Sequence, residues 1–283
     1  MTLLRSLLLW FILGALSAPA VADRANLTLA IHPFKPPTEL VDAFTPLANY
    51  LAQRTDHSIT ISISKSYQDH VDNIGKDAVD IAYMGPASYV KLRETYGPKR
   101  LLARQAINGL PTFHGKIFVR NDSTIHSLQD LIGKRFAFGD ANSTMGFLVP
   151  YYMLLQAGVP REKLAVAGTI NGHVNNVIAV LAGDYDAGAV KEDVFYQYEK
   201  RGIRAIATTP PIADHLFVAS DQLNEQTVSL LRTALLELSQ QADGATILNS
   251  VTPGITALVA AKDEDYRNLR EILAELKKHG VEP

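Results

Sequence analysis

The sequence contains no cysteine in its 283 residues, which excludes disulfides, thiolate metal sites and cysteine nucleophiles. Its one tryptophan is Trp10, so the chain beyond that point cannot build a tryptophan cage around a quaternary ammonium ligand. The formal net charge is only −2, with both signs dispersed, which excludes the basic footprint of a nucleic-acid-binding protein. Local donors, rather than overall charge, must therefore hold any anionic ligand.

The first 22 residues have the pattern of a secretory signal peptide. Arg5 precedes an apolar run over residues 7–16, and the small residues of Ala20-Val21-Ala22 precede Asp23. The run is short for a membrane span, which makes an N-terminal anchor the weaker alternative, and no cysteine follows it to carry a lipid. We therefore expect a soluble periplasmic protein after cleavage near Ala22.

The rest of the chain alternates short apolar strands with helical patterns. This alternation predicts an α/β fold with mostly parallel sheets covered on both faces. Pro46 is expected to interrupt the first helix. The expected strands are 27–31, 59–63, 79–83, 116–120, 135–139, 164–167, 185–190, 204–208 and 216–219, and the expected helices are 40–51, 68–76, one from residue 87, 127–131, one ending at residue 157, 173–182, 225–240 and 263–279.

The series is long for a single sheet, and no low-complexity linker divides it. We therefore predict two doubly wound α/β lobes joined by a two-strand hinge near residues 116–120 and 215–220. The first lobe would comprise residues 23–117 plus 218–283, and the second residues 118–217. Because doubly wound sheets bind ligands beyond the carboxyl ends of their strands, the cleft between the lobes is the expected site. The protein is expected to be a monomer.

The strongest local signal is the segment from Phe138 to Gly146, Phe-Gly-Asp-Ala-Asn-Ser-Thr-Met-Gly. Here a strand ends, Ser143 and Thr144 follow, and a helix begins. Unpaired N–H groups at a helix start, with adjacent hydroxyls, can bind a small oxyanion without lysine or arginine. The alternative is that Ser143 or Thr144 only caps the helix.

Two further donors follow strands. His173 opens a helix after Asn171-Gly172 and could donate a ring N–H to an anion, although a histidine satisfied by its own loop is the simpler alternative. Tyr67 follows the strand 59–63, and its alternative role is in the core.

Asp193 and Asp214 also follow strands. A carboxylate beside an anion can accept the proton of a protonated oxyanion such as HPO₄²⁻, and it would repel sulfate, which carries no proton. It could equally pair with a ligand ammonium, or be a solvated surface group.

Catalytic and metal-binding patterns are absent from the sequence. His114, His126, His215 and His279 lack metal-ligand spacing, and no phosphate-binding P-loop or nucleophile elbow occurs in a suitable context. We therefore predict a binding protein with no catalytic residue, metal or cofactor, rather than a secreted phosphatase.

Six segments occur in order along the chain: Ser66-Tyr67, Val79 to Pro86, Phe138 to Pro150, Gly172-His173, Gly183 to Ala189 and Asp265-Tyr266. In these segments and their order the chain resembles the PhnD-like family of periplasmic phosphonate/phosphite/phosphate-binding proteins of ABC importers. Methionine at positions 84 and 145 departs from the aromatic and small polar residues common there.

The resemblance implies a type II periplasmic binding protein fold whose lobes close on the ligand. Ser143, Thr144, the Met145 amide and His173 would hold a phosphorus oxyanion from the second lobe, and Tyr67 would donate from the first. Asp193 and Asp214 would meet a P–OH or a ligand amine. The further lining residues would be Tyr83, Met84, Gly85, Pro86 and His114. The partner would be an ABC permease or, alternatively, a membrane kinase or cyclase that the protein regulates as a sensory module.

Overall fold

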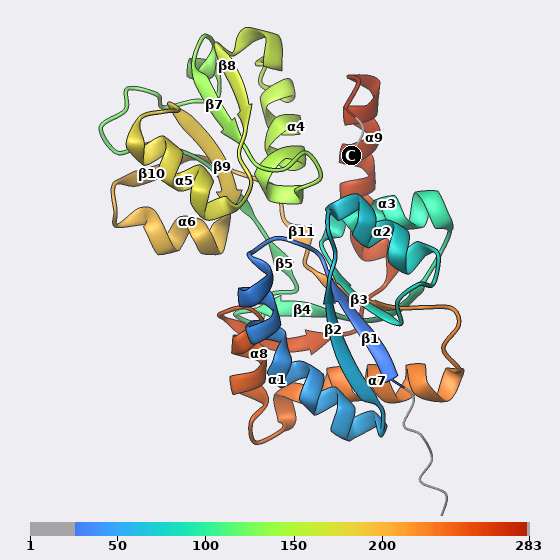
Figure 1. Cartoon of the computed structure of the whole chain (residues 1–283). Helices are drawn as coiled ribbons and strands as arrows, with labels where there is room; N and C mark the ends of the chain where they lie inside the picture. The colour runs from blue at the N-terminus through green and yellow to red at the C-terminus, as the bar shows by residue number, and fades with distance from the viewer. Residues whose placement is uncertain (1–25, 282–283) are drawn as a thin grey trace, which may run out of the picture.

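The computed structural model describes residues 26–281, so the predicted signal peptide lies outside the described residues. The chain forms two α/β lobes, each built on its own sheet (Figure 1). This confirms the predicted two-lobed α/β fold, but both sheets are mixed rather than mostly parallel, because β4, β12 and β13 of the first sheet and β6 and β10 of the second pair antiparallel. No helix within the described part of the chain is long and apolar enough to cross a membrane.

The first lobe contains a six-stranded sheet of order β13-β4-β12-β3-β1-β2. β1, β2 and β3 are parallel, whereas β12 is antiparallel to β3 and β4. Its strands are β1 (Asn26–Ile31), β2 (Ser58–Ile63), β3 (Ile81–Met84), β4 (Arg100–Ile107), β12 (Leu216–Ala219) and β13 (Ile255–Val259). Its helices are α1 (Pro37–Thr55), α2 (Tyr67–Gly75), α3 (Pro86–Tyr96), α7 (Glu225–Glu237) and α8 (Gly244–Val251).

The second lobe contains a five-stranded sheet of order β10-β6-β9-β7-β8. Phe118, Phe136 and Phe138 are fully buried in its strands. The strands are β6 (Gly115–Arg120), β7 (Arg135–Phe138), β8 (Val166–Thr169), β9 (Ala187–Lys191) and β10 (Ile203–Thr208). The helices are α4 (Val149–Gln156), α5 (His173–Ala182) and α6 (Glu192–Glu199), with a π-helical turn over Thr144–Leu148 immediately before α4.

The chain crosses between the lobes through a two-stranded ribbon of β5 (Thr112–Phe113) and β11 (Ile212–Ala213). This corrects the crossing predicted at 116–120 and 215–220, because β6 is hydrogen-bonded within the second sheet and β12 within the first. Residues 115–117 therefore belong to the second lobe and residues 216–217 to the first, the reverse of the predicted boundaries.

The last helix, α9 (Arg267–Lys278), packs against α3 of the first lobe and α4 of the second (Figure 1). Its apolar residues Leu269, Leu273 and Leu276 are buried in a core shared by both lobes. The hydroxyl of Tyr266, just before α9, donates to the carbonyl of Asp214 beside the hinge at 2.9 Å. The C-terminal helix therefore braces the two lobes on the side of α3 and α4.

Other predictions fail where tertiary packing outweighs local propensity. α1 continues through Pro46, because Leu40, Phe44, Leu47 and Leu51 bury one face of the helix on the first sheet and offset the lost backbone hydrogen bond.

β4, β13 and α8 were not predicted. Arg100, Arg104 and Gln105 interrupt the apolar pattern of β4.

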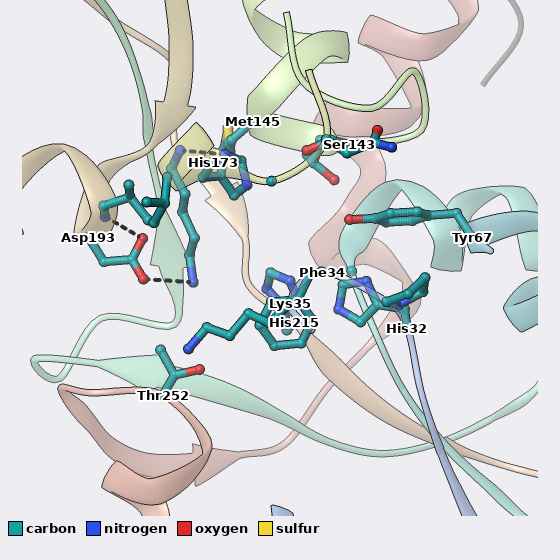
Figure 2. Close-up of a pocket in the computed structure, with 18 of the residues that line it drawn as sticks. His32, Phe34, Lys35, Tyr67, Ser143, Met145, His173, Asp193, His215 and Thr252 are labelled. Atoms are coloured by element: carbon teal, nitrogen blue, oxygen red, sulfur yellow. Dashed lines mark hydrogen bonds and ion pairs between the residues drawn. The ribbon is translucent and has the colours of Figure 1, made fainter. Parts of the chain in front are cut away.

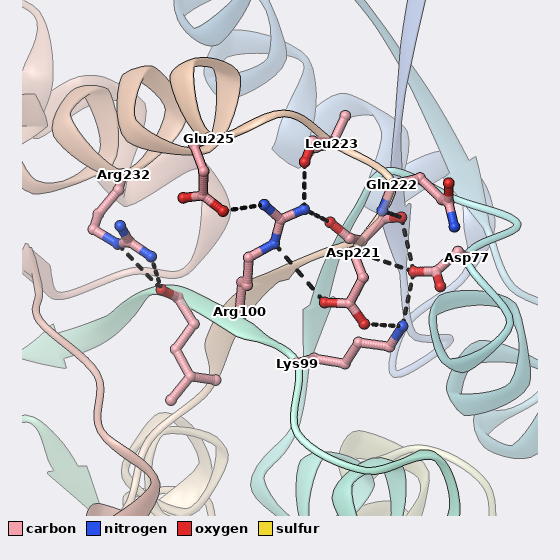
Figure 3. Close-up of polar contacts among 10 residues, drawn as sticks. Asp77, Lys99, Arg100, Asp221, Gln222, Leu223, Glu225 and Arg232 are labelled. Carbon is pink, nitrogen blue, oxygen red and sulfur yellow. Dashed lines mark hydrogen bonds and ion pairs between the residues drawn. The ribbon is translucent and has the colours of Figure 1, made fainter.

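A network of charged residues joins the start of β4 to the connection between β12 and α7 (Figure 3). Lys99, whose side chain is 3 % exposed, donates to Asp77 at 2.7 Å and to Asp221 at 2.8 Å. Arg100 bonds the carboxylate of Glu225 at 3.0 Å and the carbonyl of Leu223 at 2.6 Å. These contacts fix the start of β4 relative to the segment that follows β12. Both segments are polar, so apolar packing alone would not fix their positions.

We expect Lys99→Met to lower the free energy of unfolding by about 2–4 kcal/mol, because it leaves Asp77 and Asp221 without their shared cation. Urea unfolding measures this change. The matched control is Arg54→Met, which removes an ion pair to Glu237 whose side chains are both about 40 % exposed, and which should cost less than about 1 kcal/mol. Equal effects of the two substitutions would contradict a structural role for the buried network.

Candidate functional site

One cavity of about 530 Å³ lies between the lobes, and several helices begin at its wall. Tyr67 and His173 are the first residues of α2 and α5, and Thr144 is the first of the helical segment that leads into α4. Lys191 immediately precedes α6, and Pro36 immediately precedes α1. All five line the cavity. Unpaired amides and aligned peptide dipoles make such helix starts favourable for an anion.

The loop before α4 closes on itself at two glycines. The Gly139 amide donates to the Gly146 carbonyl at 2.7 Å, and a Cβ on Gly139 would lie 2.9 Å from the Cα of Gly146. Only glycine at both positions permits this approach. Residues 140–145 are thereby held in a tight turn that presents Ser143 to the cavity (Figure 2).

Ser143 has the role of a cap as well as that of a cavity donor. Its Oγ accepts from the Gly146 amide at 3.1 Å, which leaves the hydroxyl hydrogen free to donate. Thr144 Oγ1 accepts from the Ala87 amide, at the start of α3, at 3.1 Å. This contact joins the two lobes beside the cavity.

His173 is held as a neutral donor. Its Nδ1 accepts from the Lys191 amide at 3.4 Å, so the ring proton resides on Nε2, at the other side of the ring. Burial lowers the pKa of His173 to about 4, and the nearby Asp193 opposes this only in part. We call Ser143, Thr144, Met145 and His173 the oxyanion cradle. Tyr67 faces the cradle from the first lobe, and burial raises the pKa of its hydroxyl, which remains a donor.

On the first-lobe side the cavity is lined by two neutral histidines, His32 and His215, and the ring of His70, which does not line the cavity, lies close to His32. The ring centroid of His32 lies 5.3 Å from that of His215 and 5.9 Å from that of His70. Burial, followed by the neighbouring His215 and His70 rings, holds the pKa of His32 well below its ordinary value. Burial also lowers the pKa of His215, and that of His70 to about 4.

His215 is oriented by a buried carboxylate. Asp214 Oδ1 accepts from the His215 ring Nδ1 and from its backbone amide, both at 2.8 Å, and from Gln105 Nε2 at 2.8 Å. Burial favours the neutral acid, but Lys191 and His215 hold the pKa of Asp214 below its ordinary value, so Asp214 is ionised. With Nδ1–H donating to Asp214, Nε2 of neutral His215 is an acceptor. A Cβ on Gly85, another lining residue, would lie 3.5 Å from it.

The predicted site residues divide into two groups. Tyr67, Ser143, Thr144, Met145, His173, Asp193, Tyr83 and Gly85 line the cavity. Asp214, Met84, Pro86 and His114 are not among the lining residues. Asp214 is fully buried and accepts hydrogen bonds from His215 and Gln105, and Met84 is fully buried in the core. Pro86 occupies the first position of α3, and the His114 ring bonds the Thr209 carbonyl at 2.8 Å.

The lining residues that sequence reasoning missed include four titratable ones: His32, Lys35, Lys191 and His215. His32 immediately follows β1 and Lys35 lies in the loop after it. His215 lies between β11 and β12, and Lys191 is the last residue of β9. Position at or just after the end of a strand was therefore the signal that could have identified them. Lys191 is 8 % exposed, and its Nζ lies 3.8 Å from Asp193 Oδ2. The attraction of Asp193 and Asp214 outweighs burial and raises the pKa of Lys191, which is therefore charged.

Residues 29–266 match the family model described as ABC transporter, phosphonate, periplasmic substrate-binding protein. The chain belongs to this family. It is therefore the periplasmic substrate-binding component of a phosphonate-type ABC transporter, and its relatives are binding proteins rather than enzymes.

Individual relatives support the assignment. The phosphate-import protein PhnD of Mycolicibacterium smegmatis is 24 % identical over 87 % of this chain and 84 % of its own length. The "Probable ABC transporter phosphite binding protein PhnD1" of Prochlorococcus marinus is 25 % identical over 93 % of each chain. The structure of PhnD1 from Prochlorococcus marinus in complex with methylphosphonate superposes with a TM-score of 0.81 at 25 % identity, covering 89 % of this chain and 98 % of that one.

The neutral histidines predict a loss of stability in acid. Between pH 6.5 and about 4 the unfolded chain binds protons that the folded His70 and His173 do not, so unfolding becomes easier as the pH falls. Each such histidine contributes up to about 1.4 kcal/mol per pH unit. Urea unfolding gives the free energy of unfolding of the native protein and of His70→Asn. The difference between the two should become smaller as the pH falls from 7 to 4.5. A constant difference would contradict a neutral His70.

Proposed function

We propose that this protein captures a small phosphorus oxyanion, a phosphonate, phosphite or phosphate, between its lobes and delivers it to an ABC permease. The observation that carries the proposal is the convergence of donors on one cavity. The Ser143 hydroxyl, the amides that begin the helical segment at Thr144, the His173 Nε2–H and the Tyr67 hydroxyl all belong to residues that line it.

The donors come from both lobes, so a bound oxyanion would link them. Closure excludes water, and each hydrogen bond to the anion becomes stronger in the resulting lower dielectric. The hydrogen bond from the Ala87 amide to Thr144 Oγ1 already joins the lobes on one side of the cavity. A permease would then distinguish the loaded protein by its closed form.

The acceptor in the cavity favours a protonated oxyanion. A ligand P–OH can donate to Nε2 of His215, whose other nitrogen is engaged by Asp214. The role predicted for Asp214 is thus assigned to His215, with Asp214 as the group that orients it. Sulfate has no proton at neutral pH, and its oxygens would meet the His215 lone pair unfavourably.

We expect Ser143→Ala to weaken binding of methylphosphonate or phosphate about 10- to 100-fold, because a hydrogen bond to a charged group contributes about 1.5–3 kcal/mol. Isothermal titration calorimetry measures the change. Asn224→Ala is the matched control, since Asn224 also caps a helix, accepting from the Thr227 amide at 2.8 Å, and does not line the cavity. Unchanged affinity in Ser143→Ala would contradict the cradle.

Sulfate should bind the native protein at least about 100-fold more weakly than phosphate. The reason is that sulfate has no proton to donate to the buried Nε2 of His215, which is then left without a hydrogen bond and faces an oxyanion. Competition calorimetry with the two anions at pH 7 measures the ratio. Equal affinities would remove the proposed role of the His215 and Asp214 pair, although not that of the cradle.

A further inference from the structure

The side of the cavity opposite Ser143 and Tyr67 carries two lysines. Lys35 extends toward the same side as Asp193 and Thr252 in Figure 2, and the ammonium of Lys191 is joined to Asp193 there. Lys35, Lys191 and Thr252 all line the cavity. We call these three residues the cationic side, and no part of the oxyanion cradle belongs to it.

The cavity is larger than a bare oxyanion requires. A tetrahedral oxyanion of about five heavy atoms displaces on the order of 100 Å³, since one water molecule occupies ~30 Å³ in the liquid. The cavity measures about 530 Å³, which is within the range of sites for larger organic ligands. A ligand seated in the cradle therefore has room for a substituent that reaches the cationic side.

The carboxylates near the cationic side are already engaged or distant from it. Asp193 Oδ1 accepts from the Val194 amide at 2.9 Å, and Oδ2 faces the Lys191 ammonium at 3.8 Å. Lys191 thus occupies the place beside Asp193 that a ligand ammonium would need. Asp214 is buried outside the cavity wall, and Glu39 lies at the exposed rim, where water and salt screen its charge.

Lys35 has no such partner. Within residues 26–281 no carboxylate forms an ion pair with its ammonium, and the side chain lines the cavity mouth. The Lys191 ammonium is buried, where its interaction with a ligand charge is weakly screened. Lys35 and Lys191 therefore offer two ammonium groups that an anionic substituent of the ligand can reach on this side of the cavity, whereas an ammonium substituent would compete with Lys191 for Asp193.

We infer that the ligand is a phosphonate or phosphate that carries a second anionic group, such as a carboxylate, bound by Lys35 and Lys191. This inference rests on the proposed function, since the phosphoryl group must occupy the cradle. Lys191 would also act as a specificity-determining residue that excludes aminoalkylphosphonates by presenting its own ammonium to Asp193.

Calorimetry with three phosphonates tests the inference: methylphosphonate, phosphonoacetate and 2-aminoethylphosphonate. In the native protein phosphonoacetate should bind about tenfold more tightly than methylphosphonate, and 2-aminoethylphosphonate about tenfold more weakly. Lys35→Met should reduce the ratio of phosphonoacetate to methylphosphonate affinity, because only Lys191 then remains to bind the carboxylate. Lys191→Met should narrow the penalty on 2-aminoethylphosphonate, because Asp193 becomes available to its amine. Lys65→Met, an exposed lysine outside the cavity, should preserve both ratios.

Two outcomes separate this inference from the proposed function. If methylphosphonate binds but 2-aminoethylphosphonate binds as tightly, or if the preference for phosphonoacetate is undiminished in Lys35→Met, the anionic-substituent assignment is wrong and the cradle stands. If neither the three phosphonates nor phosphate binds the native protein, the proposed function and the inference both fail. Thermal melting of Lys35→Met and Lys191→Met identifies any variant that does not fold, and Lys35, being exposed, should tolerate the change.

Discussion

The site depends on the close approach of two backbone segments at the end of β7. Because Gly139 and Gly146 carry no Cβ, the Gly139 amide reaches the Gly146 carbonyl at 2.7 Å, and the residues between them turn back on themselves. This contact sets the direction of Ser143 and the position at which the helical segment begins. The His173 ring packs close to the same glycine, since a Cβ on Gly146 would lie 3.3 Å from its Cε1. A side chain at either glycine would displace the donors together.

The hydrogen-bonding character of the neutral histidines in the cavity is set by the groups to which they are bonded. Burial keeps His173 and His215 uncharged, and their hydrogen bonds then decide which nitrogen carries the proton. His173 accepts from a backbone amide and so offers an N–H, whereas His215 donates to Asp214 and so offers a lone pair. Two residues of the same type thus present opposite hydrogen-bonding character to the same cavity, because their fixed partners differ.

Much of the donor set was accessible from sequence because its members follow strands or begin helices. Ser143, Thr144 and His173 lie at such positions in a recognisable order, and the cavity includes all three. The charged members were not accessible in this way. Lys191 stands next to Glu192 and Asp193, and such a charged segment is typical of a solvated surface. Whether this lysine is solvated or buried beside Asp193 depends on how the second sheet packs. Asp214 follows a strand as Asp193 does, yet it points into the protein, where its Oδ1 accepts from Gln105 of β4 and from the His215 ring.

The sequence by itself determined the alternation of strands and helices, and with it the two-lobed α/β class, because periodic burial is a local property of each segment. It also determined the loop over residues 139–146, since glycines, hydroxyls and a helix start are adjacent in the chain. Only the tertiary structure decided the exact hinge, because β6 and β12 are assigned to lobes by which strands they pair with. It likewise decided the continuity of α1 through Pro46, the place of β4 in the first sheet, and the protonation of the histidines. Each of these depends on contacts between residues distant in sequence, whose energies no local pattern contains.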